Sequence, residues 1–323
     1  MPNRTPVTLI DANYKAPMTQ RPRTIQIFLP AGDPRGIRVA ALTTSIVQVI
    51  EVPRPLLPQF LQMPESKQVG VYYLIGDDED KDQPSVYIGQ TGSLGKRLNE
   101  PDLDPKREFW NRALVALSLT HSLTQTHSMY LEWQSIQQAN TAQRYTVENG
   151  NAGSRPHTPA ALEADCQEIF DTIRTLVATM GQPVFEPLAL RRELTDVDTL
   201  RLPDVAQVGP PALLRCKGAG CDATGQYTEE GLVVLKQSRA RIEVVKSMIP
   251  MSAGKNRQRL IDAGDLKLDS DAYIFQRDVL FKSPSGASDV VLGRSSNGWL
   301  EWKNAEGRTL DELKRQKIAA AAV

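Results

Sequence analysis

Two tyrosines, an arginine and a glutamate occur in this chain in an order that would suit metal-assisted cleavage of a phosphodiester. Tyr72 and Tyr87 are 15 positions apart, Arg97 follows 10 residues later, and Glu132 comes further along the chain. A guanidinium can hold two phosphate oxygens, a carboxylate can bind a hard cation such as Mg²⁺, and a phenol can take part in proton transfer. Together these residue types predict phosphodiester hydrolysis.

Two predicted strands carry the tyrosines. Residues 69–75 and 85–88 are rich in apolar and β-branched side chains, and the charged, glycine-containing segment 76–84 between them predicts an exposed connection. Because alternate side chains of a strand share a face, Tyr72 and Tyr87 can be brought to one side of this hairpin. Cross-strand packing is the competing explanation for such a tyrosine pair.

A short helix is predicted to present Arg97. The segment 91–93 offers an N-cap, and Leu94 and Leu98 mark the buried face of the helix that follows. Arg97 lies at the border of that face, so its stem can pack while its guanidinium reaches into a cleft. Lys96 is expected to point toward solvent.

Glu132 is predicted to lie on a longer amphipathic helix over residues 124–142, after a central strand at 112–118. It stands beside the apolar stripe of that helix. A carboxylate at the edge of a core costs free energy unless a cation or hydrogen bonds satisfy it. Glu132 is therefore a candidate metal ligand, and an ordinary surface glutamate is the alternative.

The tripeptides at 70–72 (Gly-Val-Tyr) and 87–89 (Tyr-Ile-Gly) resemble the paired motif of the GIY-YIG nuclease superfamily. The resemblance covers residues 65–150. It implies a domain with a three-stranded antiparallel sheet flanked by helices and an endonuclease activity that depends on Mg²⁺ or Mn²⁺. The positions that match the residues of the superfamily's site are Tyr72, Tyr87, Arg97, Glu132 and Asn149.

The resemblance also implies a role for each of these residues. Glu132 would bind the metal and Arg97 the phosphate, while Asn149 would orient Glu132 or a water, although turn formation by an Asn-Gly pair explains Asn149 equally well. Related endonucleases often carry a histidine one helical turn after the arginine, where this chain has Pro101. We therefore expect a tyrosine, Tyr72 or Tyr87, to act as the general base.

Further contacts with substrate are expected from one cation and two glycines. Lys96 would add positive charge beside the phosphate. Gly70 and Gly89 lack a Cβ, so a substrate backbone could approach the end of the sheet closely at these positions. We therefore predict that Lys96, Gly70 and Gly89 bind substrate.

The flanks of the motif predict an α+β protein with several parts. Residues 283–293 and the following Asn297–Trp302 segment resemble a small domain of unknown function that is often appended to GIY-YIG proteins. Proline-rich and charged stretches mark the boundaries. The predicted parts are a disordered tail at 1–23, a β-rich N-terminal module at 24–64, the nuclease-like domain with a C-terminal helix at 65–190, a linker at 191–211 and a small α+β accessory domain at 212–323.

Composition limits the setting in which this chemistry takes place. The chain has 323 residues, with 38 Lys and Arg against 38 Asp and Glu, so any attraction to nucleic acid must be local. No apolar run is long enough to span a bilayer, and the N-terminal segment lacks the apolar stretch of a secretory signal, so we expect no membrane contact and a cytoplasmic protein. Three cysteines argue against a disulfide framework, and Cys216 and Cys221 are either two ordinary thiols or part of a zinc site.

A basic stretch in the C-terminal region is a candidate phosphate-contacting surface. Between residues 236 and 259 a single acidic residue, Glu243, stands among cations. A solvated helix face explains the same pattern, since no aromatic residue is interleaved for base stacking. The cations are Lys236, Arg239, Arg241, Lys246, Lys255, Arg257 and Arg259.

Three function classes follow from the sequence. The first is a divalent-metal-dependent endonuclease that acts on duplex or branched DNA. The second is a nucleic-acid-binding protein that keeps the GIY-YIG scaffold without turnover, as Pro101 and the neutral net charge would suit. The third is a protein-interaction module whose protein partners the sequence does not identify. The motif residues favour the endonuclease.

Overall fold

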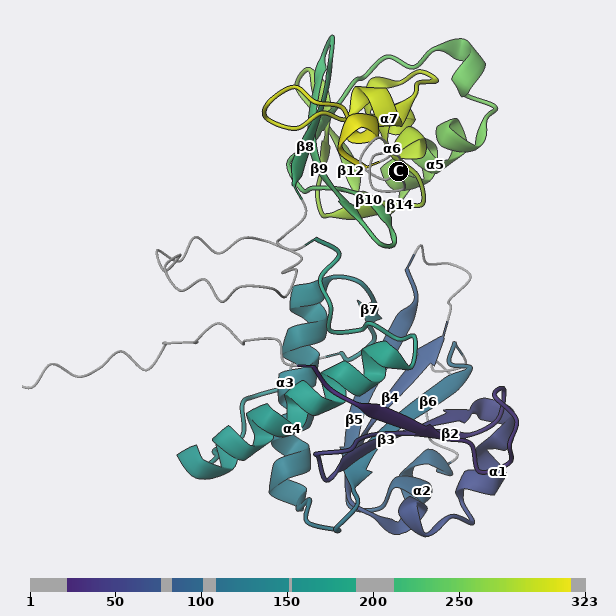
Figure 1. Ribbon diagram of the computed structural model, residues 1–323, viewed down its shortest axis with the longest axis vertical. Coiled ribbons are helices and arrows are strands. Elements are labelled where there is room, and N and C mark those ends of the chain that lie inside the picture. The colour runs from purple at the N-terminus through teal and green to yellow at the C-terminus, as the bar shows by residue number, and fades with distance from the viewer. Residues whose placement is uncertain (1–21, 77–82, 101–108, 151–152, 190–211, 315–323) are drawn as a thin grey trace, which may run out of the picture.

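The computed structural model describes residues 22–76, 83–100, 109–150, 153–189 and 212–314. Its described residues form two seven-stranded sheets, one before residue 189 and one after residue 212, and each sheet has its own helices (Figure 1). The predicted α+β class is confirmed.

The first sheet carries the motif. Its strand order is β1-β2-β3-β6-β4-β5-β7, antiparallel throughout except for the parallel pair β5–β7. Every residue of β4 is buried, as expected for an apolar strand covered on both faces. The strands are β1 (Ile25–Phe28), β2 (Arg38–Leu42), β3 (Val47–Pro53), β4 (Gly70–Gly76), β5 (Ser85–Thr91), β6 (Arg112–Ser118) and β7 (Thr146–Val147).

The N-terminal strands differ from the expected separate module at 24–64. Strand β3 pairs with β6 along its whole length, from Val47 opposite Ser118 to Pro53 opposite Arg112. The predicted three-stranded sheet β5-β4-β6 is therefore the middle of a larger one. The physical reason is that β6 has buried side chains on both faces, and pairing with β3 satisfies its second edge.

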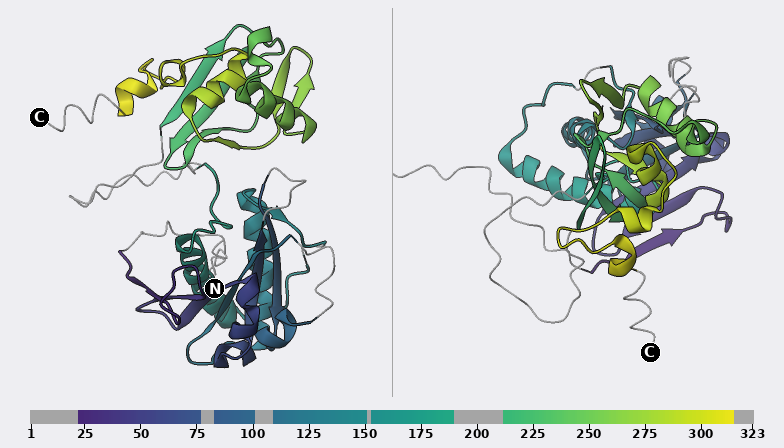
Figure 2. Two further views of the ribbon diagram at one scale, coloured as in Figure 1. Left: turned by 90° about the vertical axis from the view of Figure 1, so that its right-hand side faces the viewer. Right: turned by 90° about the horizontal axis from the view of Figure 1, so that it is seen from above.

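Helices cover both faces of this sheet (Figure 2). Helices α3 and α4 share a core with Tyr73 and the side chains that point the same way, whereas α1 and α2 share a second core with Tyr72 on the opposite face. The two faces of β4 thus enter two different cores. The helical elements are η1 (Arg54–Leu56), α1 (Leu57–Phe60), η2 (Pro64–Lys67), α2 (Leu94–Leu98), α3 (Gln125–Ala142) and α4 (Ala160–Thr179).

The second sheet has the order β12-β13-β11-β9-β10-β14, with β8 paired to β9. Helix α6 packs against it within the C-terminal core. The strands are β8 (Leu213–Gly218), β9 (Cys221–Thr228), β10 (Gly231–Val234), β11 (Arg239–Ala240), β12 (Leu266–Asp269), β13 (Ala272–Phe275) and β14 (Val279–Phe281). The helical elements are η4 (Lys246–Met248), α5 (Ser252–Asp262), α6 (Pro284–Leu292) and α7 (Gly298–Glu301).

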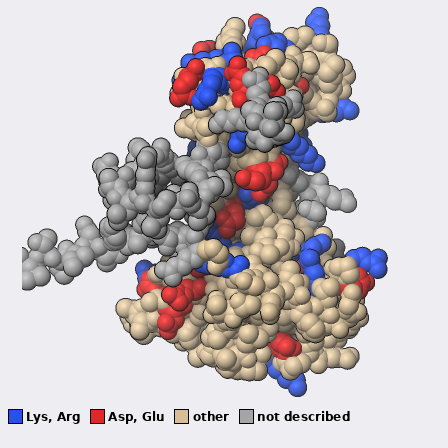
Figure 3. Space-filling model, viewed as in Figure 1, with Lys and Arg blue, Asp and Glu red and all other residues tan. Residues whose placement is uncertain are grey.

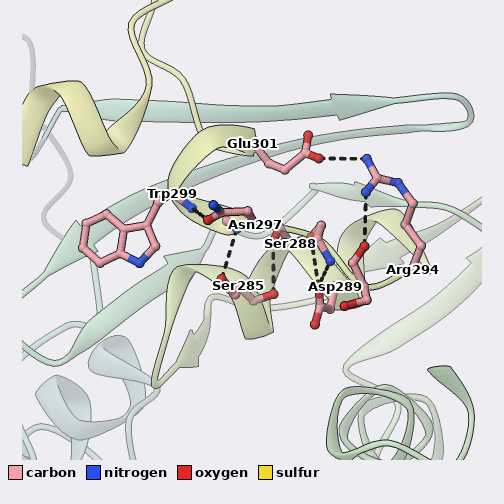
Figure 4. A network of polar contacts seen from close by, with 10 residues as sticks. Ser285, Ser288, Asp289, Arg294, Asn297, Trp299 and Glu301 are labelled. Carbon is pink, nitrogen blue, oxygen red and sulfur yellow. Dashed lines mark hydrogen bonds and ion pairs between the residues drawn. The ribbon is translucent and has the colours of Figure 1, made fainter.

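Polar contacts join α6 to α7 (Figure 4). The backbone N–H of Gly298 donates to Ser285 Oγ at 3.1 Å, and Arg294 pairs with Glu301 at 2.8 Å. Trp302 is fully buried and its Nε1 donates to the carbonyl of Pro284 at 3.1 Å. This tryptophan is therefore a core side chain whose polar atom is satisfied.

Cys216 and Cys221 are both buried in the C-terminal core. Burial raises the pKa of the Cys216 thiol to about 12 and also raises that of Cys221. In its protonated form each thiol is a small apolar side chain of this core.

Some expectations concern segments that the structure does not cover. The tail at 1–23, the connection at 76–84 and the linker at 191–211 lie largely or wholly outside the described residues. Among the helices that are described, none combines the length and the apolar character needed to cross a bilayer.

Candidate functional site

The β4–β5 hairpin brings the two motif tyrosines together. In its register Tyr72 lies opposite Gly89, and Leu74 lies opposite Tyr87. The tyrosines are therefore diagonal neighbours on one face, with ring centroids 6.2 Å apart and planes inclined by 35°.

Arg97 reaches the same place from α2. Leu94 and Leu98 are buried and fix the helix, so that Arg97 Nε donates to Tyr72 Oη at 3.2 Å. Arg97 also forms an ion pair with Glu100. The bond to Tyr72 first, and that to Glu100 second, raise the pKa of Arg97 above its already high ordinary value. The site therefore holds a permanent positive charge beside a phenol oxygen.

The three side chains differ in their access to solvent. Tyr72 is 1% exposed, whereas Tyr87 is half-buried and the side chain of Arg97 is 32% exposed. A molecule that approaches from solvent would thus meet Tyr87 and Arg97, with Tyr72 behind them.

The motif glycines leave room for protein atoms. A Cβ on Gly89 would lie 2.3 Å from Tyr72 Oη, and a Cβ on Gly70 would lie 2.5 Å from the carbonyl oxygen of Ala116. Protein atoms therefore fill the space beside each glycine. Internal packing, rather than close approach of a substrate backbone, explains why glycine stands at these positions. Contact between these glycines and substrate stays a prediction that this packing does not favour.

Glu132 reaches the hairpin from α3, the helix on the other face, where Tyr73 Oη and Ser135 Oγ lie 3.1 Å apart. Its carboxylate accepts a hydrogen bond from the backbone N–H of Gln90, and burial raises its pKa despite that bond. The hydroxyl of Tyr72 lies over Gly89, the neighbour of Gln90. Tyr72 and Glu132 therefore approach neighbouring residues of β5, but they come from cores on opposite faces of the sheet.

Asn149 also contacts β5. Its Oδ1 accepts from the backbone N–H of Ile88 at 3.0 Å, and its Nδ2 donates to the carbonyl of Ile88 at 2.7 Å. The backbone N–H and C=O groups of a strand point to opposite edges at successive residues, so those of Ile88 and Gln90, two residues apart, point to the same edge of β5. Asn149 and Glu132 thus hold one edge of β5, and the amide of Asn149 is engaged with Ile88 on both its atoms.

The residues present fit a divalent cation that is only partly held by protein. Glu132 is half-buried, and none of the described cations forms an ion pair with it, so a metal ion would offset the cost of its desolvation. Among the described residues, no three His, Cys, Asp or Glu side chains gather in a way that could hold a metal. Mg²⁺ keeps several waters and often takes only one or two protein carboxylates, which suits a single glutamate.

Two other predicted features have simpler outcomes. Lys96 is exposed on α2, as expected for a residue that points to solvent. Pro101, the departure from the superfamily pattern, lies outside the described residues.

The predicted basic surface of the C-terminal region is wrong in part. Arg257 is 3% exposed and belongs to the interior. Arg239 pairs with Asp271 at 2.6 Å and Arg241 with Glu243 at 2.7 Å, so these cations are neutralised. On the face shown in Figure 3, blue and red side chains are intermixed over this domain. A contiguous sequence of cations was distributed by the fold over a strand, a turn and a helix.

Sequence reasoning missed two contributors to the site. Gln90 provides the backbone N–H that holds Glu132, a role independent of side-chain type and therefore invisible in the sequence. Glu100 lies three residues after Arg97, just past the end of α2, and this spacing could have identified it as a partner.

Comparison with known proteins assigns the C-terminal part alone. Residues 214–314 match the family described as "Domain of unknown function (DUF4357)". The predicted resemblance of this region to a domain of unknown function is therefore confirmed, and the resemblance of residues 65–150 to GIY-YIG nucleases stays a prediction. No curated protein and no solved structure matches the chain.

Proposed function

We propose that this protein is a divalent-metal-dependent endonuclease that hydrolyses phosphodiester bonds of DNA, duplex or branched, in the cytoplasm. The observation that carries the proposal is that the tyrosine pair and Arg97 lie together on one face of the β4–β5 hairpin, while the desolvated carboxylate of Glu132, from the helix on the other face, reaches the same hairpin at Gln90. Arg97 and Tyr87 are partly accessible to solvent, and Glu132 accepts from the backbone N–H of Gln90, the residue after the glycine that the Tyr72 hydroxyl covers.

Each side chain has a role that its position supports. Arg97 would hold the scissile phosphate, for which its fork of N–H donors is suited. Tyr87 is the accessible phenol, so in its deprotonated form it would accept the proton of the attacking water. Buried Tyr72 would act as a positioning residue that keeps Arg97 Nε in place.

Mg²⁺ or Mn²⁺ would be held by Glu132. When bound, it would supply positive charge to the phosphate oxygens and to the departing alkoxide. The hydrogen bond from Gln90 would keep the Glu132 carboxylate oriented toward the hairpin, and Glu100 would have to share or release Arg97 when a phosphate binds.

A second candidate is a nucleic-acid-binding or protein-interaction protein that keeps the scaffold without turnover. The ion pair between Arg97 and Glu100 favours it, because the guanidinium already has a carboxylate partner. In this case Glu132 would be a remnant, and binding would survive its replacement.

Cleavage of a panel of DNA substrates tests the proposal. The panel contains duplex, nicked, flapped and single-stranded DNA, each incubated with Mg²⁺, Mn²⁺ or a chelator. Glu132→Gln is the test variant, and Glu168→Gln, an exposed glutamate on α4, is the matched control. We expect metal-dependent cleavage that Glu132→Gln reduces by about 100-fold or more and that Glu168→Gln leaves unchanged.

The outcomes separate the two candidates. Absence of cleavage by wild type, together with DNA binding that Glu132→Gln does not alter, would replace the endonuclease with the silent scaffold. Cleavage that is the same in wild type and Glu132→Gln would show that the activity does not depend on Glu132 and would remove the support for the proposed site.

A further inference from the structure

The C-terminal domain contains a pocket of about 410 Å³ between helix α5 and neighbouring segments. Its walls are mainly apolar and its charged lining residues are both cations, Lys255 and Arg257; none of the described lining residues is acidic. The apolar walls come from Ile242, Val244, Ile249, Ile261 and Tyr273. The pocket therefore combines an apolar interior with positive charge.

Arg257 is the unusual member of this lining. It is 3% exposed, and its Nη atoms donate to the backbone carbonyls of Val290 and Arg241. Its guanidinium lies 5.1 Å from the ring centroid of Tyr273. No carboxylate among the described residues pairs with it, and burial lowers its pKa below the ordinary value of arginine.

The other buried charge in the described chain is compensated differently. Glu51 is 2% exposed and pairs with both Arg38 and Arg112. Arg257 has only carbonyl dipoles and a ring face. A buried charge without a counterion is costly, so an anion that entered the pocket would gain from pairing with this guanidinium.

The rim of the pocket is also apolar. Ile249 and Ile242 line the pocket and are 58% and 41% exposed, and Val245 and Met251 are exposed in the same stretch of the chain. These four side chains fall within ten consecutive residues. A concentration of exposed apolar side chains around a concave site is typical of a surface that binds something.

We propose that this pocket binds a small anionic amphiphile, with a carboxylate, sulfonate or phosphate group on an aliphatic or aromatic body. Lys255 and Arg257 take the anionic group, and the isoleucines and Tyr273 enclose the body. The volume lies within the roughly 300–1,000 Å³ typical of small-molecule sites. The site belongs to the domain of unknown function and does not depend on the proposed nuclease activity.

Binding of decanoate to the full-length protein tests this inference. Displacement of the fluorescent anion anilinonaphthalenesulfonate and titration calorimetry give affinity and stoichiometry. Decanol, which has the same body without the charge, is the comparator. We expect saturable binding of one decanoate per chain, at least about tenfold tighter than binding of decanol.

Variants locate the site. Ile249→Asp places a negative charge at the rim and is expected to weaken decanoate binding at least tenfold. Leu300→Asp is the matched control, because Leu300 is 51% exposed in the same domain and does not line the pocket; its affinity should stay within about twofold of wild type. Lys255→Glu is expected to weaken binding several-fold.

Arg257→Gln tests the buried cation directly, with a melting curve to establish that the variant is folded. Where it is unfolded, Lys255→Glu and Ile249→Asp decide the question, since both positions are exposed. Equal affinity for decanoate and decanol, non-saturable binding, or a decanoate affinity that Ile249→Asp leaves unchanged would each overturn the proposal.

Discussion

The site residues on the β4–β5 hairpin and α2 are of two kinds. Some are accessible to solvent, and others hold the accessible side chains in position. Tyr87 and Arg97 are accessible, and Tyr72 is buried with its hydroxyl bonded to Arg97. The superfamily resemblance treats the two tyrosines alike, but their burial separates them. A chemical role suits the accessible ring, and a positioning role suits the buried one.

Replacing each tyrosine by phenylalanine should separate these roles, provided that the proposed activity exists. Tyr87→Phe is expected to lower kcat by about 100-fold with little change in KM, because a proton acceptor is lost. Tyr72→Phe removes one hydrogen bond to Arg97, worth about 1 kcal/mol, and should chiefly raise KM, by about fivefold. Steady-state kinetics on the best substrate of the panel measures both. A larger loss of kcat in Tyr72→Phe would reverse the assignment.

The burial of Glu132 should also affect the thermal stability of the protein. Burial raises its pKa, so the folded state disfavours the ionised carboxylate; the destabilisation is present above the folded-state pKa and disappears below the ordinary value of about 4.5. Glu132→Gln is therefore expected to raise Tm near neutral pH, by an amount equivalent to at most about 1 kcal/mol given partial solvent screening.

Melting curves from pH 4 to pH 8, in metal-free buffer, test this expectation. Glu168→Gln, at an exposed position, serves as the control and should leave Tm unchanged. A gain in Tm that stayed constant down to pH 4 would show that desolvation of Glu132 is not its cause.

At the scale of elements, the edge of β5 is the support on which the site depends. Asn149 holds both backbone groups of Ile88, and Glu132 accepts from Gln90 two residues on. The parallel strand β7 pairs with β5 only at Ser85 and Val86, before this stretch begins. Beyond Val86, the side chains of Asn149 and Glu132, in place of β7, bind the backbone groups on this edge of β5.

Asn149→Ala should therefore lower stability even without any substrate. Loss of two hydrogen bonds to a partly buried backbone is expected to reduce the free energy of unfolding by about 1–3 kcal/mol. Asn140→Ala, at an exposed position on α3, is the control and should be neutral or slightly stabilising. Denaturant unfolding of the three proteins gives the comparison. Equal midpoints for all three would mean that Asn149 does not hold the strand.

At the scale of the whole molecule, the described chain divides into two sheets, each with its own packing. The first sheet is packed on its two faces by separate sets of side chains, and the C-terminal sheet has a core of its own. Among the described residues, an ion pair joins the two parts, Arg144 with Glu230 at 2.5 Å. Ion pairs near a surface contribute little, so each part is expected to be stable alone.

A fragment of residues 212–323 should fold independently. We expect its far-UV spectrum to show mixed helix and strand, and its Tm to lie within about 5 °C of a transition in the full-length chain. Glu230→Gln in the full-length protein should leave both transitions within about 2 °C. An unfolded fragment would show that the C-terminal core needs the rest of the molecule.

Local patterns in the sequence predicted much of the secondary structure around the site. The alternation of strand residues placed Tyr72 and Tyr87 on one face, and the spacing of Leu94 and Leu98 placed Arg97 at the border of its helix, because periods of 2.0 and 3.6 residues are properties of the backbone itself. The resemblance of residues 283–302 to a domain of unknown function was also visible in a contiguous stretch of sequence.

Contacts between distant segments were decided only by the tertiary structure. Pairing of β3 with β6, the bond between Gln90 and Glu132, and the burial of Arg257 each join residues that no local period relates. A strand edge accepts whichever neighbour satisfies it, and a cation is buried or exposed according to what packs around it. The sequence by itself therefore determined which residue types could do the chemistry and on which local faces they stand, while the tertiary structure decided which of them meet and which of them solvent can reach.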